Sequence, residues 1–277
     1  MSRWTDEEEK KLEEIHDKYT VKEIAKILNK SEASIDCKKR RMGLTVNINS
    51  KDRGDQYFFD SIDTEEKAYW LGFIYADGYI ISSDRNYELG IELNYKDIEH
   101  LKKFNKIFNN YYKISKKIGT YNSIEKFNGK KETNRKSETC LIRVYSKTIY
   151  EGLVKNGIVK NKTYSTIFPK IEDKVLFLHF LRGYIDGDGS YCIKKVKEHK
   201  YPRISIQGNN KLALQYIVDK LNEDFSIKAY IHKDRKCFKL EISRKHDCLK
   251  LMDLMYDNAT VYLDRKFDKV NEIKSIA

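Results

Sequence analysis

"FLRGYIDGDGSY", residues 180–191, carries an apolar run directly into two aspartates and two glycines at positions 186–189. An EF-hand calcium loop that started at Asp186 would need glycine at its sixth position and glutamate at its twelfth. Those positions hold Tyr191 and Lys197, so the stretch is not an EF-hand loop. Two alternatives remain at this point: a plain helix end followed by a turn, which is the commonest use of Asp and Gly, and a functional site.

A second stretch of the same form, "WLGFIYADGYI", occupies residues 70–80. Gly72 stands where the later stretch has Gly183, and Asp77 stands where it has Asp188. The two aspartates are 111 positions apart, which is about the length of one small domain. The repeat therefore predicts a duplicated unit rather than an array of short repeats.

The composition narrows the class of protein. The 277 residues include 54 Lys and Arg against 42 Asp and Glu, a net charge of +12, which favours a polyanionic partner. Five cysteines without a CxxC pair suit a reducing compartment and give no zinc site. No apolar run approaches the roughly 18 residues of a membrane span, and the charged N-terminus does not fit a signal peptide. We expect a folded cytoplasmic protein without a membrane segment.

Dense helix signals mark residues 1–44. The pair Thr5 and Glu8 fits a capping box, and helices are predicted over 6–18, 21–28 and 32–42. Three short helices with a tight turn before the last one predict a helix-turn-helix, and a small helical interaction domain is the alternative. The third helix ends in four cations that could enter a major groove: Lys38, Lys39, Arg40 and Arg41. Residues 45–62 are predicted to be a linker with an aromatic anchor.

Downstream, the pattern of apolar residues repeats one order of elements twice. Residues 63–160 and 161–277 are each predicted to form α-β-β-α-β-β-α, with each motif helix opening its unit. In the first unit the polar segment 125–137 is predicted to be a loop between the last two strands. The fold class is α+β, with two pseudo-symmetric units that follow a small all-α domain.

With two motifs and this element order, residues 63–270 resemble a single-chain LAGLIDADG homing endonuclease. The family pattern matches residues 70–78 and 181–189, and the flanks "GIVKNKTYSTIFPKI" and "YLDRKFDKV" are also similar to the family. The N-terminal "EIAKILNKS" and "RRMGL" resemble Myb/SANT-like helix-turn-helix modules. The resemblance implies two twisted sheets that form a saddle over duplex DNA.

The resemblance also implies a catalytic site. Gly72 and Gly183 would let the two motif helices pack closely, because a side chain there would hold them apart. This packing would bring Asp77 and Asp188 together, and a divalent cation would remove the repulsion between them. Mg²⁺, or another divalent cation such as Mn²⁺, would be held by these carboxylates and by backbone carbonyls, which the resemblance places at Ala76 and Gly187. Asp186 is predicted to be structural, because Tyr75 replaces it in the first copy.

Further site residues follow from the same resemblance. Asp97 and Asn210 stand where a polar residue that positions water is expected, although Gln is frequent there in relatives. Arg143 and Lys239 are candidates for basic residues beside the site, and solvated strand charges are the equal alternative. The second unit also carries polar residues that alternate along strands and could face DNA: Lys194, Lys195, Arg203, Ser205 and Gln207. Strand parity should divide them between the two faces of the sheet.

The leading hypothesis is thus a monomeric, site-specific DNA endonuclease that makes Mg²⁺-dependent double-strand breaks at a long, nearly asymmetric site. One alternative is a transcriptional regulator that keeps the fold for DNA binding only. That protein should lack one or both acids, and both are present. A second alternative is an intron maturase, which would bind structured RNA.

Overall fold

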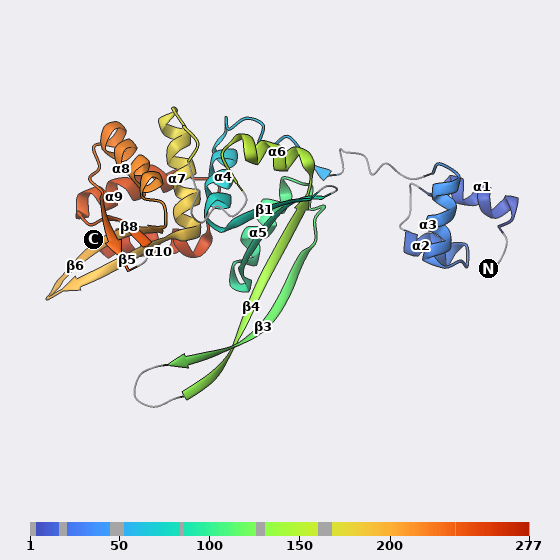
Figure 1. Ribbon diagram of the computed structural model, residues 1–277, viewed down its shortest axis with the longest axis horizontal. Coiled ribbons are helices and arrows are strands. Elements are labelled where there is room, and N and C mark those ends of the chain that lie inside the picture. Colours follow the sequence, from blue (N-terminus) through green and yellow to red (C-terminus); the bar gives the residue numbers. More distant parts are fainter. Residues whose placement is uncertain are drawn as a thin grey trace. The chain divides into compact units, whose positions relative to one another are not determined.

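The computed structural model of the chain describes residues 4–16, 21–44, 53–83, 86–125, 131–159, 168–235 and 237–276 (Figure 1). The chain divides into two compact units, residues 1–53 and 54–277. No helix within the described ranges combines the length and the apolar character that a membrane span requires.

In its described residues, the first unit contains three helices. They are α1 (Asp6–Ile15), α2 (Val21–Ile27) and α3 (Glu32–Arg41). The capping box predicted at the start of α1 is confirmed: Thr5 Oγ1 accepts from the Glu8 N–H, and the Glu8 carboxylate accepts from the Thr5 N–H. A small apolar cluster around Leu12, Ile24 and Ile35 holds the helices together.

The second unit contains two halves with the predicted order of elements. The first half runs α4 (Glu65–Asp77), β1 (Gly78–Ser83), β2 (Asn86–Asn94), η2 (Tyr95–Asp97), α5 (Ile98–Lys106), β3 (Ile114–Glu125), β4 (Lys131–Tyr145) and α6 (Lys147–Lys155). The second half runs α7 (Lys174–Asp188), β5 (Gly189–Val196), β6 (His199–Gly208), α8 (Lys211–Phe225), β7 (Tyr230–Asp234), β8 (Cys237–Ile242), α9 (Lys245–Tyr256) and α10 (Asp264–Ile276).

The two sheets share one topology. Their strand orders are β1-β2-β4-β3 and β5-β6-β8-β7, with every neighbouring pair antiparallel. Gly78 pairs with Ile91 at the start of the first sheet, and Gly189 pairs with Ile206 at the start of the second. This common register fixes which residues of the two halves are equivalent, and it confirms the predicted α+β fold of two pseudo-symmetric units.

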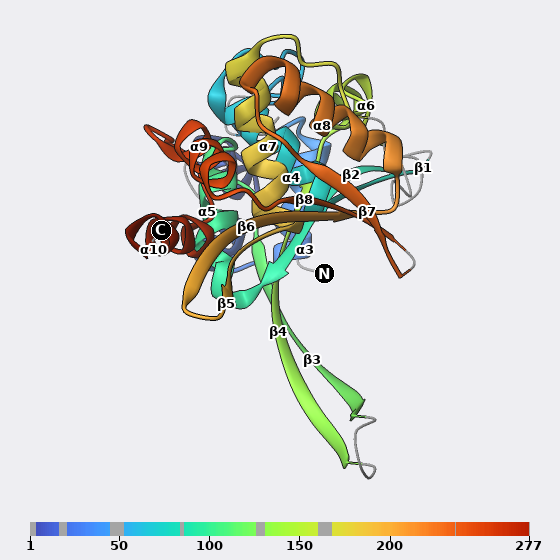
Figure 2. The ribbon, with the colours of Figure 1, turned by 90° about the vertical axis from the view of Figure 1, so that its left-hand side faces the viewer.

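Each sheet is buried on one face. In the first sheet Leu89, Ile91, Ile142 and Val144 alternate toward the helices and are fully buried or nearly so. The residues between them point to the opposite face, which we call the outer face. Figure 2 shows the strands of both sheets together with the two motif helices α4 and α7. Helices α4 and α7 pack against each other, so one continuous apolar core serves both halves.

Four details differ from the sequence predictions. The segment 125–137, predicted to be a loop, mostly continues β3 and β4 as a hairpin. The strand that the sequence predicts over residues 225–232 begins only at Tyr230, as β7. Helix α10 was not predicted. The core unit begins at Gly54, because Phe58 and Phe59 are buried in its core.

Candidate active site

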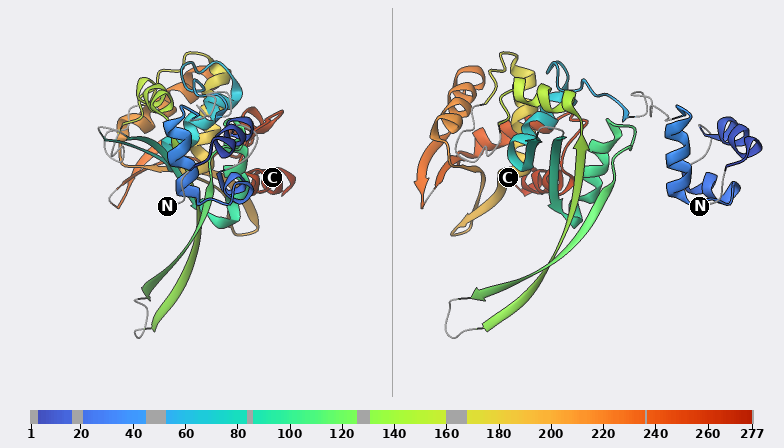
Figure 3. Two further views of the ribbon diagram at one scale, coloured as in Figure 1. Left: turned by 90° about the vertical axis from the view of Figure 1, so that its right-hand side faces the viewer. Right: turned by 45° about the vertical axis from the view of Figure 1, so that its right-hand side comes forward.

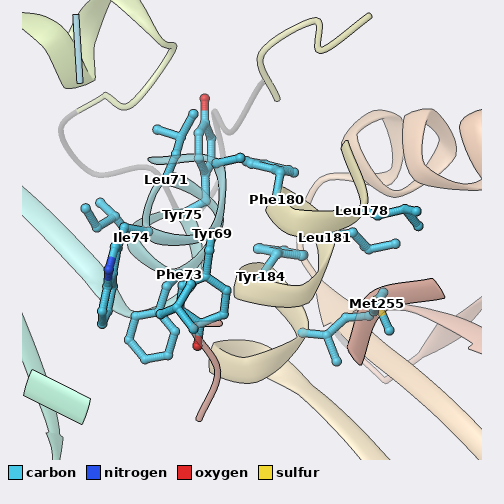
Figure 4. Close-up of a cluster of buried hydrophobic side chains, with 14 of the residues drawn as sticks. Tyr69, Leu71, Phe73, Ile74, Tyr75, Leu178, Phe180, Leu181, Tyr184 and Met255 are labelled. Atoms are coloured by element: carbon cyan, nitrogen blue, oxygen red, sulfur yellow. The ribbon is translucent and has the colours of Figure 1, made fainter. Parts of the chain in front are cut away.

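The motif helices α4 and α7 cross at two glycines. A Cβ atom at Gly72 would overlap the carbonyl oxygen of Phe180, and one at Gly183 would overlap the carbonyl oxygen of Tyr69. The contact is reciprocal, since each glycine faces the backbone of the other helix. Figure 4 shows aromatic side chains of both helices packed around this crossing. Any larger residue at either glycine would push the helices apart.

The crossing brings the ends of the two helices together. A Cβ atom at Gly187 would overlap the Cβ of Ala76 and would lie 3.2 Å from Oδ2 of Asp77. Asp77 and Asp188 are the last residues of α4 and α7, and a strand follows each of them directly. Asp77 is half-buried and Asp188 is exposed. Two carboxylates therefore stand at adjoining helix ends, at the point where both sheets begin.

A pocket of about 350 Å³ opens beside Asp188. Tyr75 and Ala76 of α4, Tyr184 of α7 and the β6–α8 connection contribute to its lining. Asn210 belongs to that connection and caps α8, since its Oδ1 accepts from the N–H groups of Leu212 and Ala213. The structure thus places Asn210 in the same pocket as Asp188.

Asp97 occupies the same place in the first half as Asn210 in the second. Each is the N-cap residue of the helix that follows the first two strands, α5 or α8, and the buried Leu101 and Leu214 follow them at the same spacing. Both carboxylate oxygens of Asp97 accept from Nε of Arg265 on α10, at 3.1 and 3.0 Å.

Lys266 on α10 is a site residue that the sequence analysis missed. Its Nζ donates to the carbonyl of Ile185, at 3.0 Å, and to that of Gly189, so it binds the end of α7. Burial lowers the pKa of Lys266 to about 8, and the nearby Asp77 and Asp188 oppose this shift. The segment "YLDRKFDKV" that contains it had been noted as similar to the family, which was the available signal.

Asp186 is fully buried and sits in a hydrogen-bonded network. Its carboxylate accepts from the Tyr256 hydroxyl at 2.6 Å, the Tyr69 hydroxyl at 2.8 Å and the Leu263 N–H at 2.8 Å. Burial raises the pKa of Asp186, while these three donors oppose the rise. With no exposed surface and three donors already in place, Asp186 holds the α9–α10 connection against both motif helices.

Arg143 and Lys239 lie in ion pairs on the outer faces of the sheets. Nε of Arg143 lies 3.1 Å from Oε1 of Glu88, and Nζ of Lys239 lies 3.4 Å from Oε2 of Glu241. Glu241 also binds Arg203 at 2.9 Å.

The two arginine–glutamate pairs occupy equivalent positions with acid and base exchanged. Glu88 precedes Ile91 by three residues, as Arg203 precedes Ile206. Across the sheet, Arg143 pairs with Gly90, as Glu241 pairs with Ser205. Each half therefore presents one guanidinium held by a carboxylate on its outer face, at the same distance along the strands.

The candidate DNA-binding residues of the second half fall on both faces of the sheet. The β5–β6 register places Lys194, Arg203, Ser205 and Gln207 on the outer face. Lys195 lies on the opposite face of β5, as the parity argument anticipated for part of the set.

In the N-terminal unit, two of the four cations at the end of α3 have internal partners. Lys38 forms an ion pair with Glu9, and Lys39 is buried and donates to the His16 carbonyl at 3.0 Å. Arg41 is exposed, and the side chain of Arg40 lies outside the described structure. Lys39 is therefore a structural residue rather than a surface cation, a correction to the sequence prediction.

Comparisons with known proteins bear on the fold. The homing endonuclease I-WcaI, solved bound to its DNA recognition sequence, superposes with a TM-score of 0.53 at 19% identity, over 82% of this chain and 95% of that chain. The chain thus has the two-motif LAGLIDADG fold. The meganuclease I-SmaMI bound to uncleavable DNA superposes less well, with a TM-score of 0.48 at 14% identity, over 74% of this chain and 88% of that chain.

In sequence, the chain is 26% identical over 176 residues to an uncharacterized protein of Methanocaldococcus jannaschii. The match covers 62% of this chain and 60% of that protein. No protein-family model matches the chain.

Proposed function

We propose that the chain is a site-specific DNA endonuclease, a homing enzyme that hydrolyses one phosphodiester bond in each strand of duplex DNA. The observation that carries this proposal is the crossing of α4 and α7 at Gly72 and Gly183, with Asp77 and Asp188 at the adjoining helix ends. Both acids precede a strand whose sheet offers its outer face to a partner. A purely structural helix end would not require equivalent acids in both halves.

The donor set at the helix ends fits Mg²⁺. Within the ranges that the structure describes, no group of three or more His, Cys, Asp or Glu side chains could hold a metal. Asp77 and Asp188 would therefore act with the carbonyl oxygens of Ala76 and Gly187 and with water, an oxygen set that Mg²⁺ prefers over the N and S ligands of zinc. When bound, Mg²⁺ activates water and stabilises charge on the attacking and leaving oxygens.

Other residues of the site have roles that their positions support. Lys266 Nζ, fixed between two carbonyls at the end of α7, would hold positive charge beside the carboxylates and the developing phosphate charge. Asn210, in the pocket with Asp188, would orient a water through its amide. Asp97 would act only by positioning Arg265 and α10.

Double-stranded DNA is the proposed partner, and one chain is the proposed functional unit. The core unit contains both motif helices, so the crossing forms within a single chain. Outer-face cations would bind phosphates and make affinity depend on salt, while base-edge contacts would give specificity. We keep the proposal that the N-terminal helices form a second DNA-binding module, which Arg41 would serve.

The three N-terminal helices also favour a second candidate, a DNA-binding regulator that does not cut. The two functions separate in one experiment. The substrate is DNA that spans the locus into which the gene of this protein inserts, taken from a copy without the insertion. This DNA is incubated with the protein and Mg²⁺. A double-strand break that EDTA abolishes supports the nuclease, and tight binding without any break on such targets supports the regulator.

A further inference from the structure

The pocket beside Asp188 depends on a small residue of α8. Ala213 lies in the first turn of that helix and contributes only a methyl group to the lining, which it shares with Tyr184 and the helix cap Asn210. Gln207, which lies on the outer face of the sheet, also lines the pocket. At about 30 Å³ per molecule, the volume of about 350 Å³ has room for about ten waters.

In the first half, the position that corresponds to Ala213 carries a large ring. The counterpart of Ala213 on α8 is His100 on α5, because each stands three positions after the N-cap residue of its helix. Figure 3 shows these two helices on opposite sides of the motif helices α4 and α7. An alanine methyl group in one half is therefore replaced by an imidazole in the other.

The imidazole of His100 fills the space that the methyl group of Ala213 leaves open. Phe73 is the counterpart of the pocket residue Tyr184, since each stands four positions before the acid of its helix. The ring of His100 lies 4.6 Å from that of Phe73 and 4.7 Å from that of Trp70, measured between centroids. His100 is buried, so protein atoms occupy the space that is a pocket in the second half.

Hydrogen bonds hold the imidazole of His100 in this position. Its Nε2 lies 3.1 Å from the Tyr69 hydroxyl, which donates to the Asp186 carboxylate at 2.8 Å. All three residues are buried, so the ring cannot turn away without breaking a buried network. The difference between the two halves is therefore fixed by the fold.

The polar residues at the two helix caps differ in the same direction. Asn210 lines the pocket, and an amide can hydrogen-bond to water. Asp97, at the same place in the first half, has both carboxylate oxygens bound by Nε of Arg265. The second half thus places a polar side chain beside a space for water, whereas the first half ties the corresponding side chain to α10.

We propose that the two strands of the target are cut in a fixed order, beginning with the strand whose scissile phosphate lies beside the pocket of the second half. The inference rests on the proposed function. In each cut the oxygen of one water bonds to phosphorus and one P–O ester bond breaks. One proton of that water ends on the leaving oxygen and the other on the product phosphate.

The pocket gives the two cuts different rates. On the side of Asp188 it holds water next to the scissile phosphate and near the amide of Asn210, so the attacking water is positioned before the reaction. On the side of Asp77, His100 occupies the corresponding space, and the attacking water is less well positioned. Nicked duplex DNA is therefore the expected intermediate.

Single-turnover cleavage of target DNA with a different label on each strand tests this order. The full chain is mixed with the labelled duplex and Mg²⁺, and the rate of each cut is measured. Wild type should cut one strand at least about 10-fold faster than the other, so that nicked duplex accumulates. Equal rates for the two strands would overturn the proposal.

The variant Ala213→His gives the second half the side chain of the first. Because Ala213 lines the pocket, the new ring has open space to enter. It should slow the faster cut by about 10-fold and leave the rate of the slower cut unchanged. Gln215→His is the matched control, since Gln215 lies on the same helix and is exposed. If Ala213→His slows both cuts equally, or only the slower one, the proposal is wrong.

Thermal denaturation shows whether the Ala213→His variant keeps the fold. Ala213→Val adds less volume, serves as the second variant and should narrow the difference between the strands in the same direction. A wild-type protein that cuts neither strand would reject the proposed function and the order together. A wild-type protein that cuts both strands at one rate would keep the proposed function and reject the order alone.

Discussion

The two halves of the core are alike where the helices cross and unlike around it. Gly72 matches Gly183 in contact as well as in sequence, because each faces the backbone of the other helix. Three positions further along the same helices, Tyr75 donates a hydrogen bond to the Asn156 carbonyl, at 2.7 Å, while the equivalent Asp186 accepts three. Tyr75 secures the end of α6 and Asp186 secures the α9–α10 connection, so the two residues support different parts with different chemistry.

The difference shows which features the duplication has to keep. The crossing and the paired acids must match, since one site is built from both halves. The supporting contacts need only hold their helix in place, so Leu71 in the first half corresponds to the fully buried Arg182 in the second. Nε of Arg182 donates to the Val261 carbonyl, and Nη2 of Arg182 forms an ion pair with Oε1 of Glu65 at 2.7 Å. The predictions below test this division, from the largest expected effect to the smallest.

Replacing either crossing glycine should be the most damaging change. Gly72→Leu and Gly183→Leu should each lower the free energy of unfolding by more than about 4 kcal/mol, because the new side chain meets backbone that cannot move aside. Urea unfolding followed by circular dichroism measures this. Gly208→Ala is the control, since a Cβ there lies 3.5 Å from the Leu214 side chain, an ordinary contact. A tolerated leucine at one glycine would break the symmetry of the crossing.

Asp186 and Tyr75, which make different numbers of hydrogen bonds, should contribute unequally to the free energy of unfolding. Asp186→Asn should cost about 3 kcal/mol of stability, because an amide turned toward three donors breaks a buried charged network. Tyr75→Phe removes one hydrogen bond and should cost about 1 kcal/mol. The same denaturation assay applies to both variants. Equal losses would show that the two halves are supported alike.

Much of this comparison could be read from the sequence, and some could not. The duplicated "GFIYADG" and "GYIDGDG" stretches revealed the motif helices because their glycines and acids recur at fixed offsets. The distal part of the β3–β4 hairpin was taken for a loop because a ribbon with no buried face needs no alternation of apolar residues. Lys266 was missed because its nearness to the acids arises from tertiary packing of α10.

A large part of the sensitivity to mild acid should come from His100 in the first half. His100 of α5 is buried against Trp70 and Phe73, and burial lowers its pKa to about 3. Below pH 6.5 His100 becomes protonated in the unfolded chain but stays neutral in the folded chain. The free energy of unfolding therefore decreases as the pH is lowered. From pH 7 to pH 5 the loss should be about 2 kcal/mol from this residue.

Comparing wild type with the His100→Phe variant isolates the stability loss that is due to His100, because the other groups titrate equally in the two proteins. The equivalent position of α8 in the second half, counted from the N-cap residues Asp97 and Asn210, is Ala213, which cannot titrate. If the two proteins lose the same stability between pH 7 and pH 5, His100 is not the source of the effect.

The exchanged ion pairs should matter least for stability. Glu88→Gln and Glu241→Gln should each change the free energy of unfolding by about 1 kcal/mol, because each removes a charge from an ion pair whose guanidinium keeps some contact with solvent. Thermal denaturation at two salt concentrations measures this. A loss above about 2 kcal/mol from only one variant would show that the pairs are not equivalent.

The most direct test of the account is cleavage resolved by strand. Wild type, Asp77→Asn and Asp188→Asn are compared on target DNA labelled separately on each strand, with Mg²⁺, and binding is measured in parallel. Because one site is built from both halves, each variant should bind like wild type and lose double-strand cleavage by more than about 100-fold. A variant that still cuts both strands at the wild-type rate would contradict the claim that the two acids form one site.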